Sequence, residues 1–144
     1  MSVVHRHLIV RAEVEEPIVD PKVATDWLKT LIEGIGMRIT EHGGPHCDYV
    51  DRPDNYGIAA VAIIETSHVA LHIWDRDDPP LVQLDVYSCS EFEVRDVLPH
   101  LDMMKPTKIS YQFLDREKCI QVKDNSHRDL KQEQVTRGPF LDYE

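Results

Sequence analysis

Three consecutive segments between residues 58 and 89 constrain the fold most. Residues 58–64 are almost continuously apolar, a pattern that indicates a buried strand. Residues 68–74 and 81–89 instead alternate apolar and polar side chains, which is typical of strands with one buried face and one open face. A charged turn with two prolines, residues 75–80, joins these two segments. The pattern predicts neighbouring strands whose open face can carry functional groups.

Two helices and several further strands are expected around these segments. The first helix should begin at Asp20-Pro21, since Asp is a good N-cap and Pro suits the first helical position, and should end at Gly34 and Gly36. The second should follow Ser90, which forms a capping-box pattern with Glu93. The other strands are expected over residues 7–15, 37–50 (broken by Gly43-Gly44-Pro45), 107–114 and 119–122.

This order of elements predicts an α+β fold. Strands in adjacent pairs with two inserted helices suggest a two-layer sandwich, a mainly antiparallel sheet with helices on one face. The second face of the sheet is then uncovered, and a second copy of the chain could cover it and give a four-layer αββα homodimer. We expect one domain over residues 1–123, followed by a polar C-terminal tail over residues 124–144.

Charge and cysteine content exclude several classes of protein. The chain of 144 residues has a formal net charge of −10, which argues against a surface for nucleic acid or anionic membrane and suits a cationic small substrate or simply an acidic surface. Cys47, Cys89 and Cys119 are widely spaced without a CxxC pair, so neither a disulfide framework nor a zinc knuckle is indicated. The N-terminus has no apolar signal core and no run approaches about 18 apolar residues, so we expect a cytoplasmic protein.

The open face of the two alternating strands is the candidate site. If these strands pair, five side chains lie on one surface: His72, Trp74, Asp85, Tyr87 and Cys89. Together they supply an imidazole, a thiol, a carboxylate and two aromatic rings. Simple alternation leaves Ser67 on the apolar side, so the chain must turn or bulge at Thr66-Ser67 for this serine to join the site.

Three other interpretations of these residues are open. His68 and His72 could bind a metal, but four residues on a strand separate them by about 13 Å, so we expect no metal site. Ser67, His72 and Asp85 could form a catalytic triad, although the chain has no Gly-x-Ser-x-Gly elbow. Both histidines could also be ordinary solvated residues of a sheet face.

The order of residues in this region resembles the signature of the short prokaryotic-type S-adenosylmethionine decarboxylase proenzymes. The matching positions are Ser67, His68, Leu71, His72 and Trp74, then Leu84, Asp85, Val86, Tyr87 and Cys89. The resemblance extends over roughly residues 7–117, and it implies the same four-layer homodimer.

The resemblance implies a self-processing decarboxylase. Ser67 would attack the carbonyl of Thr66, and elimination would leave a pyruvoyl cofactor at position 67 that forms a Schiff base with the amine of S-adenosylmethionine. His72 matches the base of the processing reaction, and Cys89 matches the proton donor to the decarboxylated carbon. The product would serve polyamine (spermidine) biosynthesis.

The resemblance also suggests where the substrate binds. Tyr56 and Trp74 are candidate aromatic partners for adenine. The acidic candidates for substrate contact are Glu65 and Asp75, the latter one of a shifted group of carboxylates after His72.

Two departures from the family pattern leave alternatives open. Ala59 stands where the family often has a Ser or Thr that assists processing, and Thr66 stands where many members have Glu. One alternative is a decarboxylase on the same scaffold that acts on arginine or ornithine. The other is an uncleaved, non-catalytic relative that binds a ligand or a partner enzyme.

Overall fold

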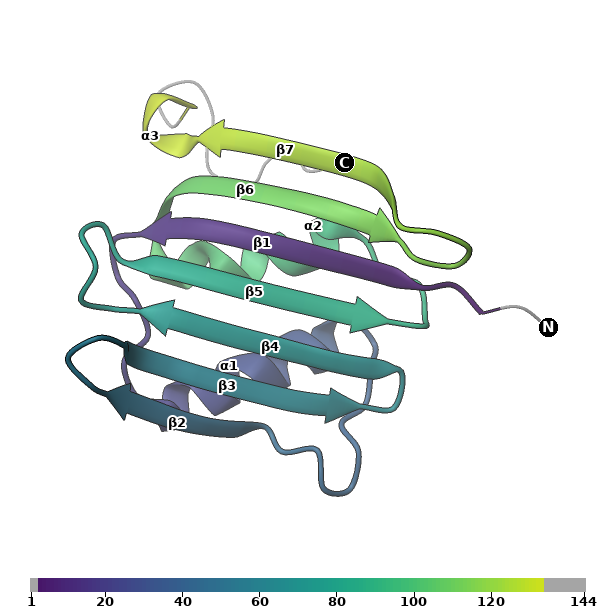
Figure 1. Cartoon of the computed structure of the whole chain (residues 1–144), viewed down its shortest axis with the longest axis horizontal. Helices are drawn as coiled ribbons and strands as arrows, with labels where there is room; N and C mark the ends of the chain where they lie inside the picture. The colour runs from purple at the N-terminus through teal and green to yellow at the C-terminus, as the bar shows by residue number, and fades with distance from the viewer. Residues whose placement is uncertain (1–2, 134–144) are drawn as a thin grey trace.

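A seven-stranded antiparallel sheet forms one layer of the computed structural model, which describes residues 3–133, and helices form the other layer (Figure 1). The strand order is β2-β3-β4-β5-β1-β6-β7. The strands are β1 (Arg6–Val14), β2 (His46–Asp51), β3 (Tyr56–Ile64), β4 (Ser67–Trp74), β5 (Leu81–Ser88), β6 (Pro106–Asp115) and β7 (Gln121–Asp129). The helices are α1 (Pro21–Gly34), α2 (Val94–Val97), the 3-10 helix η1 (Leu98–Met104) and α3 (Leu130–Glu133). The expected two-layer α+β architecture is confirmed.

The N-terminal strand lies in the interior of the sheet. β1 pairs antiparallel with β5 on one side and with β6 on the other. In this register His7 lies opposite Tyr87, and Arg6 lies opposite Ser88. The start of β1 is therefore next to the end of β5, where the candidate site was expected.

Helix α1 forms as its sequence predicts. Asp20 is the N-cap, and its carboxylate accepts a hydrogen bond from the backbone N–H of Lys22 at 2.9 Å. The helix turns one apolar face toward the sheet, with five buried residues: Ala24, Trp27, Leu28, Leu31 and Ile32. The Trp27 indole also donates a hydrogen bond to the backbone oxygen of His100 at 2.8 Å, which links α1 to η1.

The second helix begins later than its sequence pattern predicts. Glu93, not Ser90, is the N-cap, and its capping box is completed by Asp96. The backbone N–H of Ser90 instead donates to the Ser88 hydroxyl at 2.9 Å, so residues 89–91 form a turn rather than the start of a helix. After one turn of α2 the chain tightens into η1.

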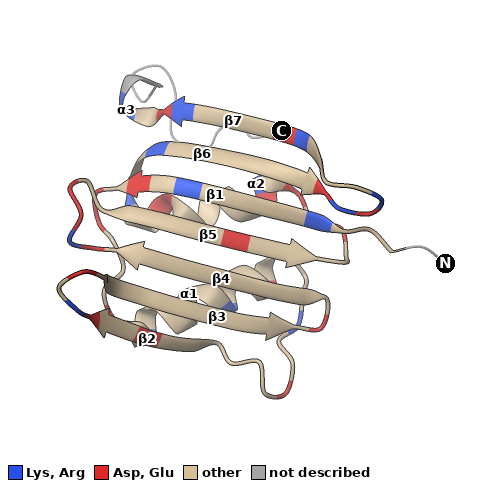
Figure 2. Ribbon diagram, viewed as in Figure 1, with Lys and Arg blue, Asp and Glu red and all other residues tan. Residues whose placement is uncertain are grey.

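The sheet has one covered and one open face. Alternate residues of β1, β4 and β5 are buried beneath the helices, including Leu8, Leu71 and Leu84. The opposite face carries the exposed side chains of Ile9 and Ile63. Figure 2 shows that β3 and β4 carry no Lys, Arg, Asp or Glu.

The sheet continues across the boundary expected at residue 123. β7 runs through that position and pairs with β6 as far as Asp129 opposite Lys108, and the buried Leu130 follows in α3. The rest of the expected tail, residues 134–144, lies outside the described residues. Over residues 3–133, no helix is long and apolar enough to cross a membrane.

Candidate active site

The turn between β3 and β4 contains the peptide bond expected to be cleaved. Glu65 and Thr66 form a tight turn, and Ser67 pairs with Ile64 at its base. The φ angle of Ser67 is 145°, in a region that residues other than glycine rarely adopt. The turn itself is formed by Glu65 and Thr66, and in the strand register Ser67 lies opposite the buried Ile64 and Ser88, so its position continues the alternation of β4.

A backbone hydrogen bond joins this turn to Cys89. The Cys89 N–H donates to the Thr66 carbonyl oxygen at 2.8 Å. This carbonyl belongs to the bond that precedes Ser67. A donated hydrogen bond polarises a carbonyl and stabilises negative charge that develops on its oxygen. The structure therefore brings the backbone of Cys89, Thr66 and Ser67 together.

A second link between the same two turns runs through hydroxyl groups. Ser88 is fully buried, and its hydroxyl donates to the Thr66 hydroxyl oxygen at 2.9 Å while accepting from the Ser90 N–H at 2.9 Å. The Thr66 hydroxyl in turn lies 3.5 Å from the Met37 sulfur. The β3–β4 turn and the β5–α2 turn are thus held together by backbone and side chains.

His72 lies away from Ser67 on the same strand. Five residues of an extended strand separate their Cα atoms by about 16 Å. His72 is exposed on the open face opposite Ala59 and Gln83, and its ring stacks on Trp74 with 6.0 Å between centroids. Within one chain the structure does not bring the expected base to the serine.

The alternative triad is not assembled either. The Asp85 carboxylate contacts Nε2 of His7, and it lies opposite Ala70, three residues along β4 from Ser67. Serine, histidine and carboxylate are therefore at three different positions along the sheet.

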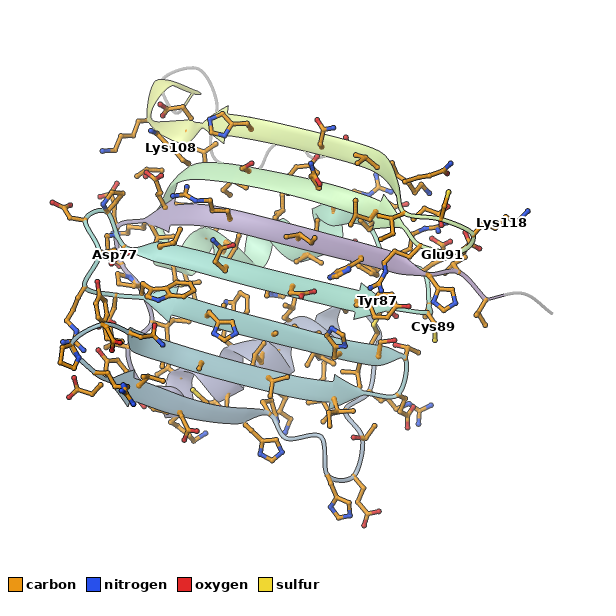
Figure 3. All side chains as sticks on the ribbon, viewed as in Figure 1. Asp77, Tyr87, Cys89, Glu91, Lys108 and Lys118 are labelled. Atoms are coloured by element: carbon orange, nitrogen blue, oxygen red, sulfur yellow. The ribbon has the colours of Figure 1, made fainter. Side chains whose placement is uncertain are left out.

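The expected substrate-binding residues fall into two groups. Glu65 lies in the turn beside Ser67, 3.9 Å from the Arg38 guanidinium. Tyr56, Trp74 and Asp75 instead gather at the opposite end of the sheet (Figure 3, near Asp77).

Hydrogen bonds order this distal group. The Trp74 indole donates to the Asn55 side chain at 3.0 Å, and the Tyr49 hydroxyl donates to the Asp75 carboxylate at 3.0 Å. The Tyr56 hydroxyl donates to Asp77, a bond that raises the pKa of the Tyr56 phenol. The phenol therefore stays protonated at neutral pH.

Sequence analysis missed a group of residues around Tyr87. His5 Nδ1 lies 2.8 Å from the Tyr87 hydroxyl, and the Arg116 guanidinium lies 4.3 Å from the ring centroid. Arg116 also approaches His7 Nδ1 at 3.1 Å; since arginine only donates, the His7 proton is on Nε2, facing Asp85. The His5-Arg6-His7 run was a visible signal, but its proximity to Tyr87 depends on the pairing of β1 with β5.

Comparison with protein-family models identifies the family of the chain. The family model described as S-adenosylmethionine decarboxylase matches residues 6–117. The match begins in β1, ends just after β6, and includes both turns of the candidate site. It covers well over half of the chain. The chain therefore belongs to the S-adenosylmethionine decarboxylase family.

Proposed function

We propose that this chain is a proenzyme that cleaves itself between Thr66 and Ser67 and then decarboxylates S-adenosylmethionine for polyamine synthesis. Family membership supports the decarboxylase activity. One contact supports the self-cleavage most directly: the Thr66 carbonyl already accepts the Cys89 N–H at 2.8 Å, next to a serine with a strained backbone.

The proposed cleavage is an acyl shift from nitrogen to oxygen. The Ser67 hydroxyl oxygen forms a bond to the Thr66 carbonyl carbon, the C–N bond breaks, and the hydroxyl proton is transferred to the nitrogen. Negative charge develops on the Thr66 oxygen, where the Cys89 N–H stabilises it. A base then removes the Ser67 Cα proton as the Thr66 carboxylate leaves, and water replaces the nitrogen, which departs as ammonia.

The residues around position 67 fit the group that this reaction would produce. A pyruvoyl group there supplies a carbonyl that withdraws the electrons released as carbon dioxide leaves. Cys89 belongs to the turn bonded to Thr66, so its thiol is the candidate donor of the proton that the product carbon then needs. Water must be kept from this site, and the open face of the sheet would need a cover.

A homodimer would supply that cover and the missing base. The row Ile9, Asp85, Ala70 and Val61 crosses the middle of the open face. We propose that two copies pack face to face about a two-fold axis along this row. His72, two residues beyond Ala70 on β4, would then lie over the partner's β4 near its Ser67.

The same symmetry would unite the two groups of expected substrate-binding residues. The end of the sheet with Tyr56, Trp74 and Asp75 would face the partner's β3–β4 turn, which contains Glu65. Each site would then combine the pyruvoyl turn of one subunit with the aromatic end of the other. β3 and β4 contain no Lys, Arg, Asp or Glu, and the Asp85 carboxylate on the axis row contacts His7 Nε2, so this packing would bury a paired carboxylate rather than an isolated one.

The test is intact-mass analysis of purified protein after prolonged incubation. The wild type is expected to give fragments 1–66 and 67–144, the second with an N-terminus blocked to sequencing, while Ser67→Ala stays at full length. Release of carbon dioxide is then measured with S-adenosylmethionine, arginine and ornithine in parallel. Cleaved protein active only on arginine or ornithine would reassign the substrate, and a wild type that stays full length would overturn the proposal.

Ala59 is the observation that favours the non-catalytic alternative. It lies directly opposite His72 on the neighbouring strand and offers no hydroxyl for processing. Ala59→Ser separates the two functions. An uncleaved wild type that begins to cleave with this change would identify a relative that has lost processing alone.

A further inference from the structure

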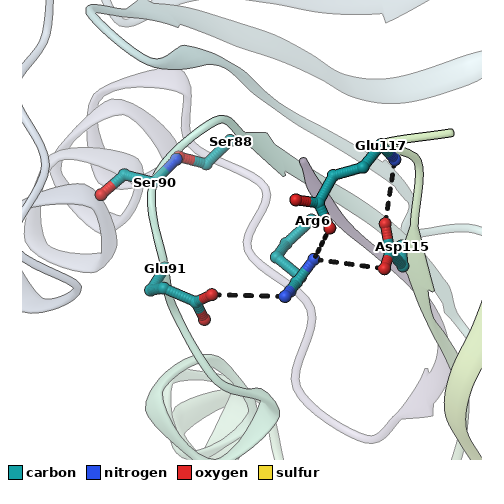
Figure 4. Close-up of polar contacts among 6 residues, drawn as sticks. All are labelled: Arg6, Ser88, Ser90, Glu91, Asp115 and Glu117. Atoms are coloured by element: carbon teal, nitrogen blue, oxygen red, sulfur yellow. Dashed lines mark hydrogen bonds and ion pairs between the residues drawn. The ribbon is translucent and has the colours of Figure 1, made fainter. Parts of the chain in front are cut away.

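Arg6 is a buried charged residue near the candidate site that the proposed reaction does not use. Its side chain is 10% exposed and lies among three carboxylates (Figure 4). One terminal nitrogen is 3.3 Å from Glu91, and the other is 3.1 Å from Glu117 and 3.6 Å from Asp115. We call these four residues the Arg6 cluster.

The Arg6 cluster adjoins the β5–α2 turn, which contains Cys89. In the sheet register Arg6 lies opposite Ser88, and Ser88 lies opposite Ser67, so the three form one row across β1, β5 and β4. Glu91 follows Cys89 by two residues and connects this turn to β1. Figure 4 shows Ser88, Ser90 and Glu91 along a single loop, with the Glu91 carboxylate joined to the Arg6 guanidinium.

The other two carboxylates hold the guanidinium from the opposite side. The backbone N–H of Glu117 donates to the Asp115 carboxylate at 2.9 Å, and this bond, assisted by Arg6, lowers the pKa of Asp115. Asp115 therefore stays ionised at neutral pH. Arg6 thus joins the β5–α2 turn to β1 and to the segment after β6.

Packing alone does not explain an arginine at this position. Burial of a charge costs free energy. A protein in which a buried ion pair is replaced by apolar residues of similar volume is often equally stable. The Arg6 Nε–H also has no hydrogen-bond partner among the described residues. The guanidinium nevertheless has what an apolar side chain lacks: a planar group of N–H donors, which can hold several carboxylates in fixed orientations.

We propose that Arg6 is a positioning residue that holds the β5–α2 turn, and with it Cys89, against the Thr66-Ser67 bond. This inference rests on the proposed function of that bond. The turn is held at three points: Cys89 N–H to the Thr66 carbonyl, Ser90 N–H to the Ser88 hydroxyl, and Glu91 to Arg6. Without the third point, Glu91 loses its anchor to β1, and residues 89–91 are held only by the two bonds at Cys89 and Ser90.

Glu91→Gln is the informative variant, because its side chain is 65% exposed and the change should not threaten folding. Asp26→Asn is the matched control: this carboxylate is 62% exposed, is paired with Lys22 at 2.8 Å, and lies on α1. We expect Glu91→Gln, which keeps an acceptor oxygen but removes its charge, to slow self-cleavage about threefold, the effect of weakening one partly exposed ion pair, and Asp26→Asn to cleave at the wild-type rate.

A second measurement does not depend on cleavage or activity. In full-length Ser67→Ala protein, the rate of iodoacetamide alkylation is followed for each cysteine by peptide mass mapping. Addition of Glu91→Gln should change the rate at Cys89 and leave Cys119 unchanged. A third measurement, in cleaved protein, is the fraction of position 67 converted to alanine during turnover, which should rise when the Cys89 thiol is displaced.

The outcomes separate the inference from the proposed function. A wild type that does not cleave overturns the proposed function, and the alkylation rates still test the Arg6 cluster. If the wild type cleaves but Glu91→Gln matches Asp26→Asn in all three measurements, the positioning role is wrong. A lower melting temperature with unchanged alkylation and alanine formation would equally overturn it, since Glu91 would then stabilise the fold alone. Arg6→Lys keeps the positive charge but lacks the planar guanidinium. Its cleavage rate should lie between those of the wild type and Glu91→Gln.

Discussion

Ser67 has two expected roles: its side chain provides the nucleophile, and its backbone conformation is strained. Its hydroxyl is the expected nucleophile, and its φ of 145° costs of order 1–3 kcal/mol for a residue with a side chain. The surrounding hydrogen bonds, including that from Cys89 to Thr66, hold the residue in this conformation. Part of that strain would be released when the Thr66-Ser67 bond breaks.

Two substitutions of Ser67 can measure this strain without cleavage. Neither Ser67→Ala nor Ser67→Gly has a hydroxyl, so both should stay at full length. Because glycine adopts positive φ freely, the glycine variant should be more stable by about 1 kcal/mol, which is about 2–4 °C in melting temperature. Differential scanning calorimetry of both proteins provides the comparison. An alanine variant that melts at or above the temperature of the glycine variant would show that the conformation is unstrained.

Substitution of each cysteine tests the assignment of Cys89. Cys89→Ala should lower decarboxylation about 10²- to 10⁴-fold, the usual contribution of a positioned proton donor. Cys47→Ala and Cys119→Ala should leave turnover within about twofold, since these cysteines lie away from the cleavage turn and burial raises the pKa of the Cys47 thiol. Turnover by cleaved protein is the measurement. Equal losses at all three cysteines would contradict the assignment.

Among the elements, the pairing of β6 with β7 extends the sheet beyond the segment that the sequence predicted. Tyr111 is buried on β6, and its hydroxyl donates to Asp124 of β7 at 2.8 Å. Burial, with help from this carboxylate, raises the pKa of Tyr111 to about 12. The strand pairing therefore controls the ionisation of a residue whose ordinary pKa is near 10.

Because of that contact, the free energy of unfolding should depend on pH through the ionisation of Tyr111. The folded protein holds the Tyr111 proton more tightly than the unfolded chain, so the resulting stability is complete below pH 10 and is lost as pH rises toward 12. We expect a loss of about 2 kcal/mol across this window in the wild type relative to Tyr111→Phe. Urea unfolding of both proteins at pH 9 to 12 measures it. A constant difference in unfolding free energy would show that β7 does not enclose the tyrosine.

The helices differ in how well their sequences predict them. α1 begins at the predicted Asp20-Pro21 because its capping signals are local: the Asp20 carboxylate accepts the N–H of Lys22, two residues along the chain. The second helix was predicted to follow Ser90, but the Ser90 N–H bonds to Ser88, so Glu93 becomes the N-cap. Ser88 is fixed by its own contact with Thr66, 22 residues away in the chain. A short-range pattern could not predict that competition.

For the whole molecule, the open face of the sheet is the surface on which we expect a second copy of the chain to pack. Ile63 is 51% exposed there, whereas Met103, which is 54% exposed, lies on η1 behind the sheet. Light scattering of the wild type should give twice the chain mass of 16.6 kDa. Ile63→Lys should shift the protein to monomer because it places a charge in the interface, and Met103→Lys should leave it dimeric. A wild type that is monomeric and still active would refute the dimer.

Complementation between subunits tests the arrangement of the dimer. Ser67→Ala and His72→Ala chains should each stay uncleaved when expressed alone. When they are co-expressed with different tags, the His72→Ala chain should cleave, because His72 of the partner subunit would reach its Ser67. The cleaved fragment is identified by its tag on a denaturing gel. If the mixed chains stay intact while the wild type cleaves, each subunit processes itself.

The amino-acid sequence determined most of the strands, the first helix, the two-layer fold class and the family motif, since each depends on spacing over a few residues; the strand expected over residues 37–50 is present only at His46–Asp51, and the one expected over 119–122 extends over Gln121–Asp129. Tertiary structure alone decided that β1 lies between β5 and β6 and that the Cys89 N–H bonds to the Thr66 carbonyl oxygen. The physical reason is the range of the interactions. Alternation and capping report the environment of neighbouring residues, whereas strand order and register depend on the burial of apolar faces contributed by the whole chain.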